Sequence, residues 1–344
     1  MLKPCIQATG PKNSKICLIG EAPGAQEELA GVPFVGYSGQ ELDRMLVEAG
    51  IQRRECYLTN VLFTRPPGNK FDALLVKKKD LPDGYKLSPV SQGKYLPHEL
   101  VPEIDRLHGE LRALRPNLIV CLGGKALWAL TGKSSISALR GSVCETPFGK
   151  MLPTYHPAAM LRDWSLRPII VADLMKASHE RLFPEIIRPQ RFIIKDPTFT
   201  EIEEFYGKAM ATSLMAVDIE TKSRRITSIG YAISKTQALH VPFYRYHPTE
   251  PHYWKTPEEE RDAWRWVGKF LGLPCKKIFQ NGLYDLQYLF RMGFRVVNCA
   301  EDTMLMHHAL FPELPKSLGF MGSIYTNEAA WKLIRKSNEE KPND

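Results

Sequence analysis

The sequence predicts an α/β protein with two domains: a parallel sheet flanked by helices, then a second domain built on a mixed sheet. The chain of 344 residues is too long for one ordinary domain. Its first half alternates short apolar runs with helical patterns, and its second half opens with three strand-like runs in succession. We place the first domain at 1–186, a linker at 187–197 and the second domain at 198–344.

Four apolar runs in the first half are predicted strands, namely 16–20, 56–63, 117–123 and 151–156. Apolar residues at helical spacing predict helices between them, at 38–50 and 99–115. Strands that alternate with helices favour a parallel sheet covered on both faces, and ligands bind such sheets beyond the carboxyl ends of the strands. Glu21, Asn60, Thr64 and His156 fall at or just after strand ends. We therefore expect several loops to converge on one crevice.

Residues 66–97 are rich in Pro, Gly and Lys and are predicted to form a long excursion from the sheet. Within it, 77–79 is a run of three lysines. Such a run is either a solvated face or a loop that contacts phosphates.

The second half restarts after 183–199, where three prolines fall among short apolar runs. Predicted strands at 214–220, 226–234 and 238–243 are followed by a helix at 257–272, a strand at 276–279 and a helix at 282–293. Strands first and helices afterwards indicate a mixed sheet.

Composition excludes several classes of protein. The apolar fraction of 44% and charged fraction of 24% are those of a soluble globular protein, and no apolar run approaches the ~20 residues of a membrane span. The first residues lack the apolar core of a signal peptide, so we expect a cytoplasmic protein. Seven scattered cysteines without C-x-x-C fit a reducing compartment. The net charge of +8 favours a polyanionic partner.

Four motifs occur in an informative order: GEAPG at 20–24, PFVG at 33–36, TNV at 59–61 and HPAAMLR at 156–162. Their order and spacing resemble the uracil-DNA glycosylase superfamily, and they look most like its family 4 members. The resemblance covers roughly residues 15–180. It implies base-excision DNA repair: hydrolysis of the N-glycosidic bond of uracil in single- or double-stranded DNA, after the nucleotide is flipped into a pocket.

The resemblance also implies residue roles. Phe34 would stack on uracil, and Asn60 would bond uracil O4 and N3–H, since an amide offers one acceptor and one donor. His156 would donate to uracil O2 as charge develops there, and Glu21 would hold the attacking water. Ala22 and Gly24 would border the base; the expected DNA contacts are Arg65, Met160, Leu161 and Arg162. In isolation, a core aromatic, a turn cap and a backbone-bonded loop histidine remain the ordinary alternatives for Phe34, Asn60 and His156.

One departure concerns a cofactor. Family 4 members usually hold an iron–sulfur cluster through four cysteines, including a pair near the start and one preceding Arg-Pro-Pro. Here Cys5 has no cysteine nearby in sequence, and Thr64 precedes Arg65. Because cluster ligation needs thiolates, we predict no cluster and no cofactor for the glycosylase activity.

Residues 214–311 resemble the DnaQ-like 3′–5′ exonuclease domain (ribonuclease H-like fold) that precedes family A DNA polymerases. Asp218 and Glu220 would lie on one face of a strand, and Asp285 would add a third carboxylate from a helix. Such a set can hold Mg²⁺. The family's final Tyr-x-x-x-Asp segment is missing, so exonuclease activity is open; Asp302 or Glu328 are alternative ligands. The basic pairs 224–225 and 276–277 either flank a DNA groove or are surface charge.

Three hypotheses follow for the whole chain. The first is a uracil-DNA glycosylase fused to a partial exonuclease domain, as in the front portion of a phage-type family A DNA polymerase. The second is a metal-dependent exonuclease whose first domain only binds DNA. The third is a non-catalytic module that senses uracil for a DNA replication complex. All three predict DNA as a partner, leave replication proteins open as further partners and exclude a membrane.

Overall fold

The computed structural model describes residues 5–245 and 252–328. These residues form two compact units. The first contains the chain up to Ile187 together with the segment that begins at Gly319, and the second contains Arg188–Leu318. In the described ranges no helix is long and apolar enough to cross a membrane. The domain limits expected from the sequence, 1–186 and 198–344 with a linker at 187–197, stay a prediction.

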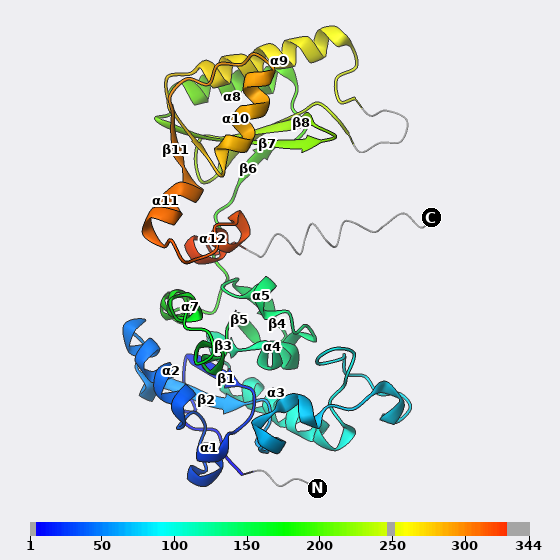
Figure 1. Cartoon of the computed structure of the whole chain (residues 1–344), viewed down its shortest axis with the longest axis vertical. Coiled ribbons are helices and arrows are strands. Elements are labelled where there is room, and N and C mark those ends of the chain that lie inside the picture. The colour runs from blue at the N-terminus through cyan, green and yellow to red at the C-terminus, as the bar shows by residue number, and fades with distance from the viewer. Residues whose placement is uncertain (1–4, 246–251, 329–344) are drawn as a thin grey trace. The chain divides into compact units, whose positions relative to one another are not determined.

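The first unit is built on a five-stranded sheet in the order β2-β1-β3-β5-β4 (Figure 1). Its strands are β1 (Ile16–Gly20), β2 (Cys56–Asn60), β3 (Leu118–Leu122), β4 (Cys144–Thr146) and β5 (Gly149–Thr154). β4 pairs antiparallel to β5 at one edge, and the other pairings are parallel. The carboxyl ends of β1, β2, β3 and β5 therefore share one edge of the sheet. Between β1 and β3 the strand order reverses direction, which makes a crevice there.

Helices cover both faces of this sheet. Its helices are α1 (Ala25–Ala30), α2 (Tyr37–Glu48), α3 (Val101–Leu114), α4 (Gly124–Thr131), α5 (Ile136–Leu139), α6 (Pro157–Met160) and α7 (Leu166–Glu180). Successive residues of a strand point to opposite faces. Cys17 and Ile19 of β1 accordingly pack in a core with α3 and α4, whereas Ile16 and Leu18 pack in a second core with α2 and α7.

The excursion at 66–97 contains short 3-10 turns at Pro67–Asn69, Phe71–Leu74 and Lys78–Asp80. Four of its apolar side chains, Phe71, Leu75, Val90 and Leu96, are buried in the core beside α3 and α4. The excursion is therefore anchored to the unit. Lys77, Lys78 and Lys79 are exposed, as both interpretations of this lysine run require.

The chain returns to the first unit after the second. Helix α12 (Leu318–Tyr325) begins at this crossing. Arg140 Nη1 donates to Ser323 Oγ at 2.8 Å, and Lys176 Nζ donates to the carbonyl oxygens of Ser323 and Thr326 at 2.5 and 2.7 Å. Arg140 is itself ion-paired with buried Asp173. These bonds attach the C-terminal segment to α5 and α7.

The second unit has a six-stranded mixed sheet in the order β11-β10-β7-β8-β9-β6. Its strands are β6 (Phe192–Ile194), β7 (Leu214–Lys222), β8 (Arg225–Ala232), β9 (Gln237–Pro242), β10 (Lys276–Phe279) and β11 (Cys299–Asp302). The pairs β7–β8 and β8–β9 are antiparallel, while β10 is parallel to both β7 and β11. Its helices are α8 (Phe199–Met210), α9 (Pro257–Gly272), α10 (Gly282–Arg291) and α11 (Thr303–Leu310).

The predicted architecture, a mainly parallel α/β sheet flanked by helices followed by a unit with a mixed sheet, is confirmed. The structure adds three short strands that the sequence analysis missed, β4, β6 and β11. Strand β6 lies inside the expected linker at 187–197. The predicted strand at 56–63 is shorter in the structure and ends at Asn60. After it, the consecutive backbone N–H groups of Val61 and Leu62 donate to the carbonyl oxygens of Gly20 and Glu21.

Candidate active site

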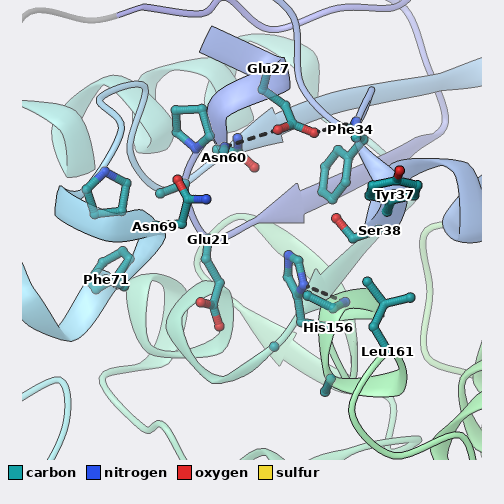
Figure 2. Close-up of a pocket in the computed structure, with 18 of the residues that line it drawn as sticks. Glu21, Glu27, Phe34, Tyr37, Ser38, Asn60, Asn69, Phe71, His156 and Leu161 are labelled. Atoms are coloured by element: carbon teal, nitrogen blue, oxygen red, sulfur yellow. Dashed lines mark hydrogen bonds between the residues drawn. The ribbon is translucent and has the colours of Figure 1, made fainter.

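A cavity of about 540 Å³ opens at the shared carboxyl edge of the first sheet. Such volumes are typical of ligand sites. The predicted residues that line it are Glu21, Ala22, Gly24, Phe34, Asn60, His156, Leu161 and Arg162. Figure 2 shows Phe34, Asn60 and His156 toward one side of this pocket and Asn69 and Phe71 toward the other, with Glu21 between them. Four separate loops therefore meet in one cavity, as expected from the parallel topology.

Asn60 and Phe34 are fixed against the end of β1. Gly20 pairs with Asn60 in the sheet register. A Cβ at Gly20 would stand 2.2 Å from Asn60 Oδ1 and 2.5 Å from Phe34 Cζ, so any larger residue would push both side chains away. Phe34 is buried and has φ of 57°, a left-handed conformation uncommon for a bulky residue. Strain of this kind is typical of functional sites.

Glu21 and His156 approach each other across Gly123. This glycine has φ of 96°, and a Cβ there would stand 2.8 Å from Glu21 Oε1 and 3.0 Å from the Cβ of His156. Only glycine allows both this backbone conformation and this close approach. The turn after β3 therefore supplies the space in which the carboxylate of Glu21 and the imidazole of His156 lie.

The imidazole of His156 has a defined tautomer. His156 caps the N-terminus of α6, and its Nδ1 accepts a hydrogen bond from the backbone N–H of Ala158 at 3.1 Å. Nδ1 is therefore unprotonated, and Nε2 carries the hydrogen. Burial has the largest effect on the pKa of His156 and lowers it. The charge of Glu21 opposes this effect, whereas the charge of Arg162 adds to it. At neutral pH the ring is thus a neutral hydrogen-bond donor through Nε2.

Glu27 is a structural anchor of the pocket that the sequence analysis missed. Its Oε1 accepts from the backbone N–H groups of Val35 and Gly36 at 3.1 and 2.8 Å, and its Oε2 accepts from Gly24 N–H at 3.1 Å. The buried carboxylate thus ties the loop after β1 to the loop that carries Phe34. The signal was present, because a Glu three residues after a helix-capping Gly24 is a capping pattern.

The expected DNA contacts divide into two groups. Leu161 is 51% exposed, and Arg162 is exposed beside it at the pocket rim. Met160 is 1% exposed and packs in the core with α2 and α7. The expectation that Met160 contacts DNA is therefore wrong for this structure, because helix α6 turns that side chain inward. Arg65 is partly exposed and bonds Asn69 Oδ1 and Glu28 Oε2 at 2.8 and 2.7 Å.

The residues near Cys5 do not fit an iron–sulfur cluster. Cys5 and Phe63 are joined by two bonds: Cys5 N–H and Sγ both donate to the Phe63 carbonyl, at 2.9 and 3.2 Å. The next residue, Thr64, donates to Glu103 Oε1 at 3.2 Å. Burial raises the pKa of the Cys5 thiol, which disfavours a thiolate. One thiol beside a hydroxyl and a carboxylate is not a four-thiolate donor set.

Three carboxylates of the second unit lie near the junction of β7 and α10. Asp218 and Glu220 occupy alternate positions of β7 and are exposed. Asp285 is buried, and its Oδ1 accepts the backbone N–H of Ile219 at 2.9 Å. Burial raises the pKa of Asp285 to about 6, and the charge of Asp218 adds to this. Although Asp218 as a whole residue is exposed, partial desolvation of its carboxyl group, and then the charge of Glu220, raise its pKa.

These side chains do not form a metal site as they stand. Within the described ranges, no three His, Cys, Asp or Glu side chains come close enough together to hold a metal ion. Both oxygens of Asp302 already accept backbone N–H groups at 2.8 Å: Oδ1 accepts from Met304 as the N-cap of α11, and Oδ2 accepts from Gly282 of α10. Glu328 belongs to the first unit. Mg²⁺ binding at this edge of the sheet stays a prediction.

One of the expected basic pairs is only half exposed. Lys276 is exposed, but Lys277 is fully buried and its Nζ donates to the carbonyl oxygens of Leu273 and Cys275. The expectation that Lys277 faces a DNA groove is therefore wrong, because its side chain points into the unit from β10. Arg224 and Arg225 are exposed at the β7–β8 turn.

The part of the chain that forms the cavity matches a known protein family. The family model described as "Uracil DNA glycosylase superfamily" matches residues 7–178, which contain every lining residue of the cavity. The chain belongs to this superfamily. Among curated relatives, the type-4 uracil-DNA glycosylase of Archaeoglobus fulgidus is 34% identical over 180 residues, which are 50% of this chain and 79% of that protein. The type-4 enzyme of Thermotoga maritima is 34% identical over 173 residues, covering 49% and 78% respectively.

A longer match extends beyond the first unit. The DNA polymerase of Bacillus phage SP01 is 24% identical over 226 residues, which are 63% of this chain but only 22% of the polymerase. Among solved structures, the Aedes aegypti Nibbler EXO domain has a TM-score of 0.32 at 13% identity, over 44% of this chain and 76% of that one. Escherichia coli RNase D has a TM-score of 0.29 at 16% identity, over 41% and 34%.

Proposed function

We propose that the first unit is a uracil-DNA glycosylase that hydrolyses the N-glycosidic bond of uracil in DNA. The observation that carries this proposal is the single cavity shared by Glu21, Phe34, Asn60 and His156. These residues come from four separate segments, namely the ends of β1, β2 and β5 and the loop between α1 and α2, and each supplies a different part of the same reaction.

The base is read and held by Asn60 and Phe34. The Asn60 amide accepts from uracil N3–H and donates to O4, and cytosine presents the reverse pattern at these two positions. Because Asn60 is buried against Gly20, a cytosine would leave polar groups unpaired without water, which is costly. Phe34 provides an aromatic face on which a flipped base stacks.

His156 and Glu21 promote bond cleavage. The base leaves as an anion, and the neutral His156 donates through Nε2 to uracil O2 as negative charge develops there. The sugar becomes positively charged, and the carboxylate of Glu21 favours that charge and orients the attacking water. Glu21 and His156 both lie against Gly123, and this closeness supports their acting on the sugar and the base of one nucleotide.

The flipped nucleotide leaves a gap that Leu161 and Arg162 are placed to fill. The half-exposed Leu161 inserts into the stack, and Arg162 contacts the phosphate backbone. Arg65, which bonds the lining residue Asn69, contributes a further backbone contact. The net charge of +8 supports DNA, single- or double-stranded, as the partner. We place the activity in the cytoplasm of a bacterium or a phage-infected host.

We propose that the second unit is an exonuclease-type domain of a polymerase-like chain. The match to a phage DNA polymerase extends beyond the glycosylase region and favours this assignment. Without a complete carboxylate set, we expect weak or absent 3′–5′ digestion and, at most, weak Mg²⁺ binding through Asp218, Glu220 and Asp285. Replication proteins are the partners that such a chain would meet.

One incubation separates the three hypotheses. A labelled oligonucleotide with one uracil is incubated with and without EDTA and then treated with alkali. We expect cleavage at the uracil position that EDTA does not affect. Magnesium-dependent shortening from the 3′ end would favour the exonuclease alternative instead. Tight uracil-dependent binding without any product would favour the sensing module.

A further inference from the structure

Asn60, the residue proposed to read the base, is buried but stands at the end of an edge strand. β2 is an edge strand, paired along its length with β1 alone, and Asn60 is its last residue. The ends of edge strands fray easily, because ladder bonds hold them on one side only. On its outer side β2 has one isolated bridge, from Leu58 to Thr9. Something else must hold the backbone of Asn60.

Arg106 of α3 makes that connection. Its Nη2 donates to the carbonyl oxygens of Asn60 and Val61, at 2.8 and 3.0 Å. The guanidinium also lies 3.4 Å from the ring centre of Phe63. One side chain thus contacts three of the four residues that lead out of β2, and two of these contacts are hydrogen bonds to backbone.

Two glutamates hold the guanidinium in this orientation. Its Nε donates to Glu103 Oε2 at 3.0 Å and its Nη1 to Glu110 Oε1 at 2.8 Å. The same glutamates bond β2 and its loop directly: Glu103 accepts from Phe63 N–H at 3.2 Å, and Glu110 accepts from Thr59 Oγ1 at 2.8 Å. All three charged side chains are largely shielded from solvent. Such planar, multiply bonded geometry is specific to arginine.

The segment that this network holds is the one where the expected cluster ligand is missing. Thr64 stands where the resemblance would place a cysteine, and its hydroxyl bonds Glu103. The exit of β2 is therefore fastened by Arg106 and its two carboxylates.

We propose that Arg106 is a positioning residue for base recognition: it fixes the backbone of Asn60, and through it the orientation of the amide that reads uracil. This proposal rests on the proposed function of the first unit. Arg106 does not line the cavity and acts through Asn60. A misplacement of about 1 Å at a reacting site can cost ~10²-fold in rate.

The test is a double-mutant cycle with Arg106→Met and Asn60→Ala, measured as single-turnover uracil excision. If Arg106 acts through Asn60, the two effects are not additive. We expect Arg106→Met to slow excision roughly 10–100-fold in the wild-type background and less than about 2-fold in the Asn60→Ala background. An equal loss in both backgrounds would overturn the proposal, since it would indicate a general structural effect.

Two further variants guard against misfolding. Arg106→Lys keeps the charge between Glu103 and Glu110 but cannot bridge both carbonyls, so we expect partial activity with a normal melting temperature. Arg112→Met, on the same helix, removes an exposed arginine that lies over Phe148, and we expect wild-type excision. Full activity of Arg106→Lys together with Arg106→Met would contradict the proposal.

A binding measurement separates this proposal from the proposed function. If the wild-type chain binds uracil-containing DNA in preference to the matching cytosine-containing DNA but does not cleave it, the glycosylase assignment fails. In that case the double-mutant cycle of Arg106→Met and Asn60→Ala is measured on the ratio of affinities for uracil-containing and cytosine-containing DNA. Loss of the ratio in Arg106→Met, with no further loss in the double variant, would still support positioning. A wild-type chain with neither excision nor preference would overturn both proposals.

Discussion

The backbone N–H of Ala158 donates to Nδ1 of His156 at 3.1 Å, and this bond defines which nitrogen of the imidazole faces the reaction. It makes His156 both the N-cap of α6 and a neutral donor through Nε2. Asparagine is also a good N-cap residue. His156→Asn should therefore preserve the helix and remove only the donor to the base.

We expect His156→Asn to reduce uracil excision by ~10²–10³, the usual cost of losing one oxyanion donor, with an unchanged melting temperature at pH 7. His156→Ala should lose the same activity and also about 1 kcal/mol of stability, because the cap is lost as well. Single-turnover rates and thermal unfolding of both variants test this. Wild-type excision by His156→Asn would remove His156 from the mechanism.

The lowered pKa of His156 also predicts a pH dependence of stability. Burial depresses the folded pKa below the unfolded value of ~6.5. Between these two values the unfolded chain binds more protons, so stability rises with pH through this window and falls on acidification. In His156→Asn this contribution should vanish. The check is the difference in unfolding free energy between the two proteins at pH 5 and pH 7.

Asn60 tests the discrimination between uracil and cytosine. Asn60→Ala should lose most uracil excision, and Asn60→Asp should lose it too, with any new activity directed to cytosine. The assay compares release of both bases from otherwise identical oligonucleotides. Uracil excision by Asn60→Ala at the wild-type rate would contradict the pocket assignment.

Asp285 predicts a pH effect of opposite sign in the second unit. Its folded pKa is raised to about 6, so its contribution to stability is complete in acid and is lost as pH rises through 6. Asp285→Asn, whose amide oxygen can still accept from Ile219, should stabilise the unit at pH 8 by on the order of 1–2 kcal/mol after solvent screening. Hydrogen exchange of β7 at pH 5 and 8 measures this. An equal effect at both pH values would contradict the assigned cause.

The C-terminal segment should stabilise the first unit. Ser323 and Thr326 accept bonds from Arg140 and Lys176, and Met321 is buried. Hydrogen bonds to charged groups contribute ~1.5–3 kcal/mol each when formed in such sites. Deletion of 319–344 should therefore lower the melting temperature of the first unit, compared with deletion of 329–344. Identical melting of the two truncated chains would show that this contact is not stabilising.

The sequence predicted that the candidate catalytic residues come together at one edge of the sheet, but not which residues hold them in place. Glu21, Asn60 and His156 could be placed together because parallel strands end at one edge, and a carboxylate, an amide and an imidazole there are informative. Arg106 and Glu27 could not be found in the same way. Both act through backbone groups 46 and 8–9 residues away in sequence, and such contacts depend on how helices pack. Met160 was misplaced because a motif does not show which face of a one-turn helix is buried.

The most direct test of the account is detection of the released base itself. Duplex and single-stranded oligonucleotides carrying one uracil are incubated with the chain in EDTA, and free uracil is quantified by mass spectrometry. The account predicts stoichiometric uracil, an intact strand with an abasic site, and ~10²-fold or greater loss in His156→Asn. Absence of free uracil from wild-type protein, or release of nucleotides in place of the base, would contradict it.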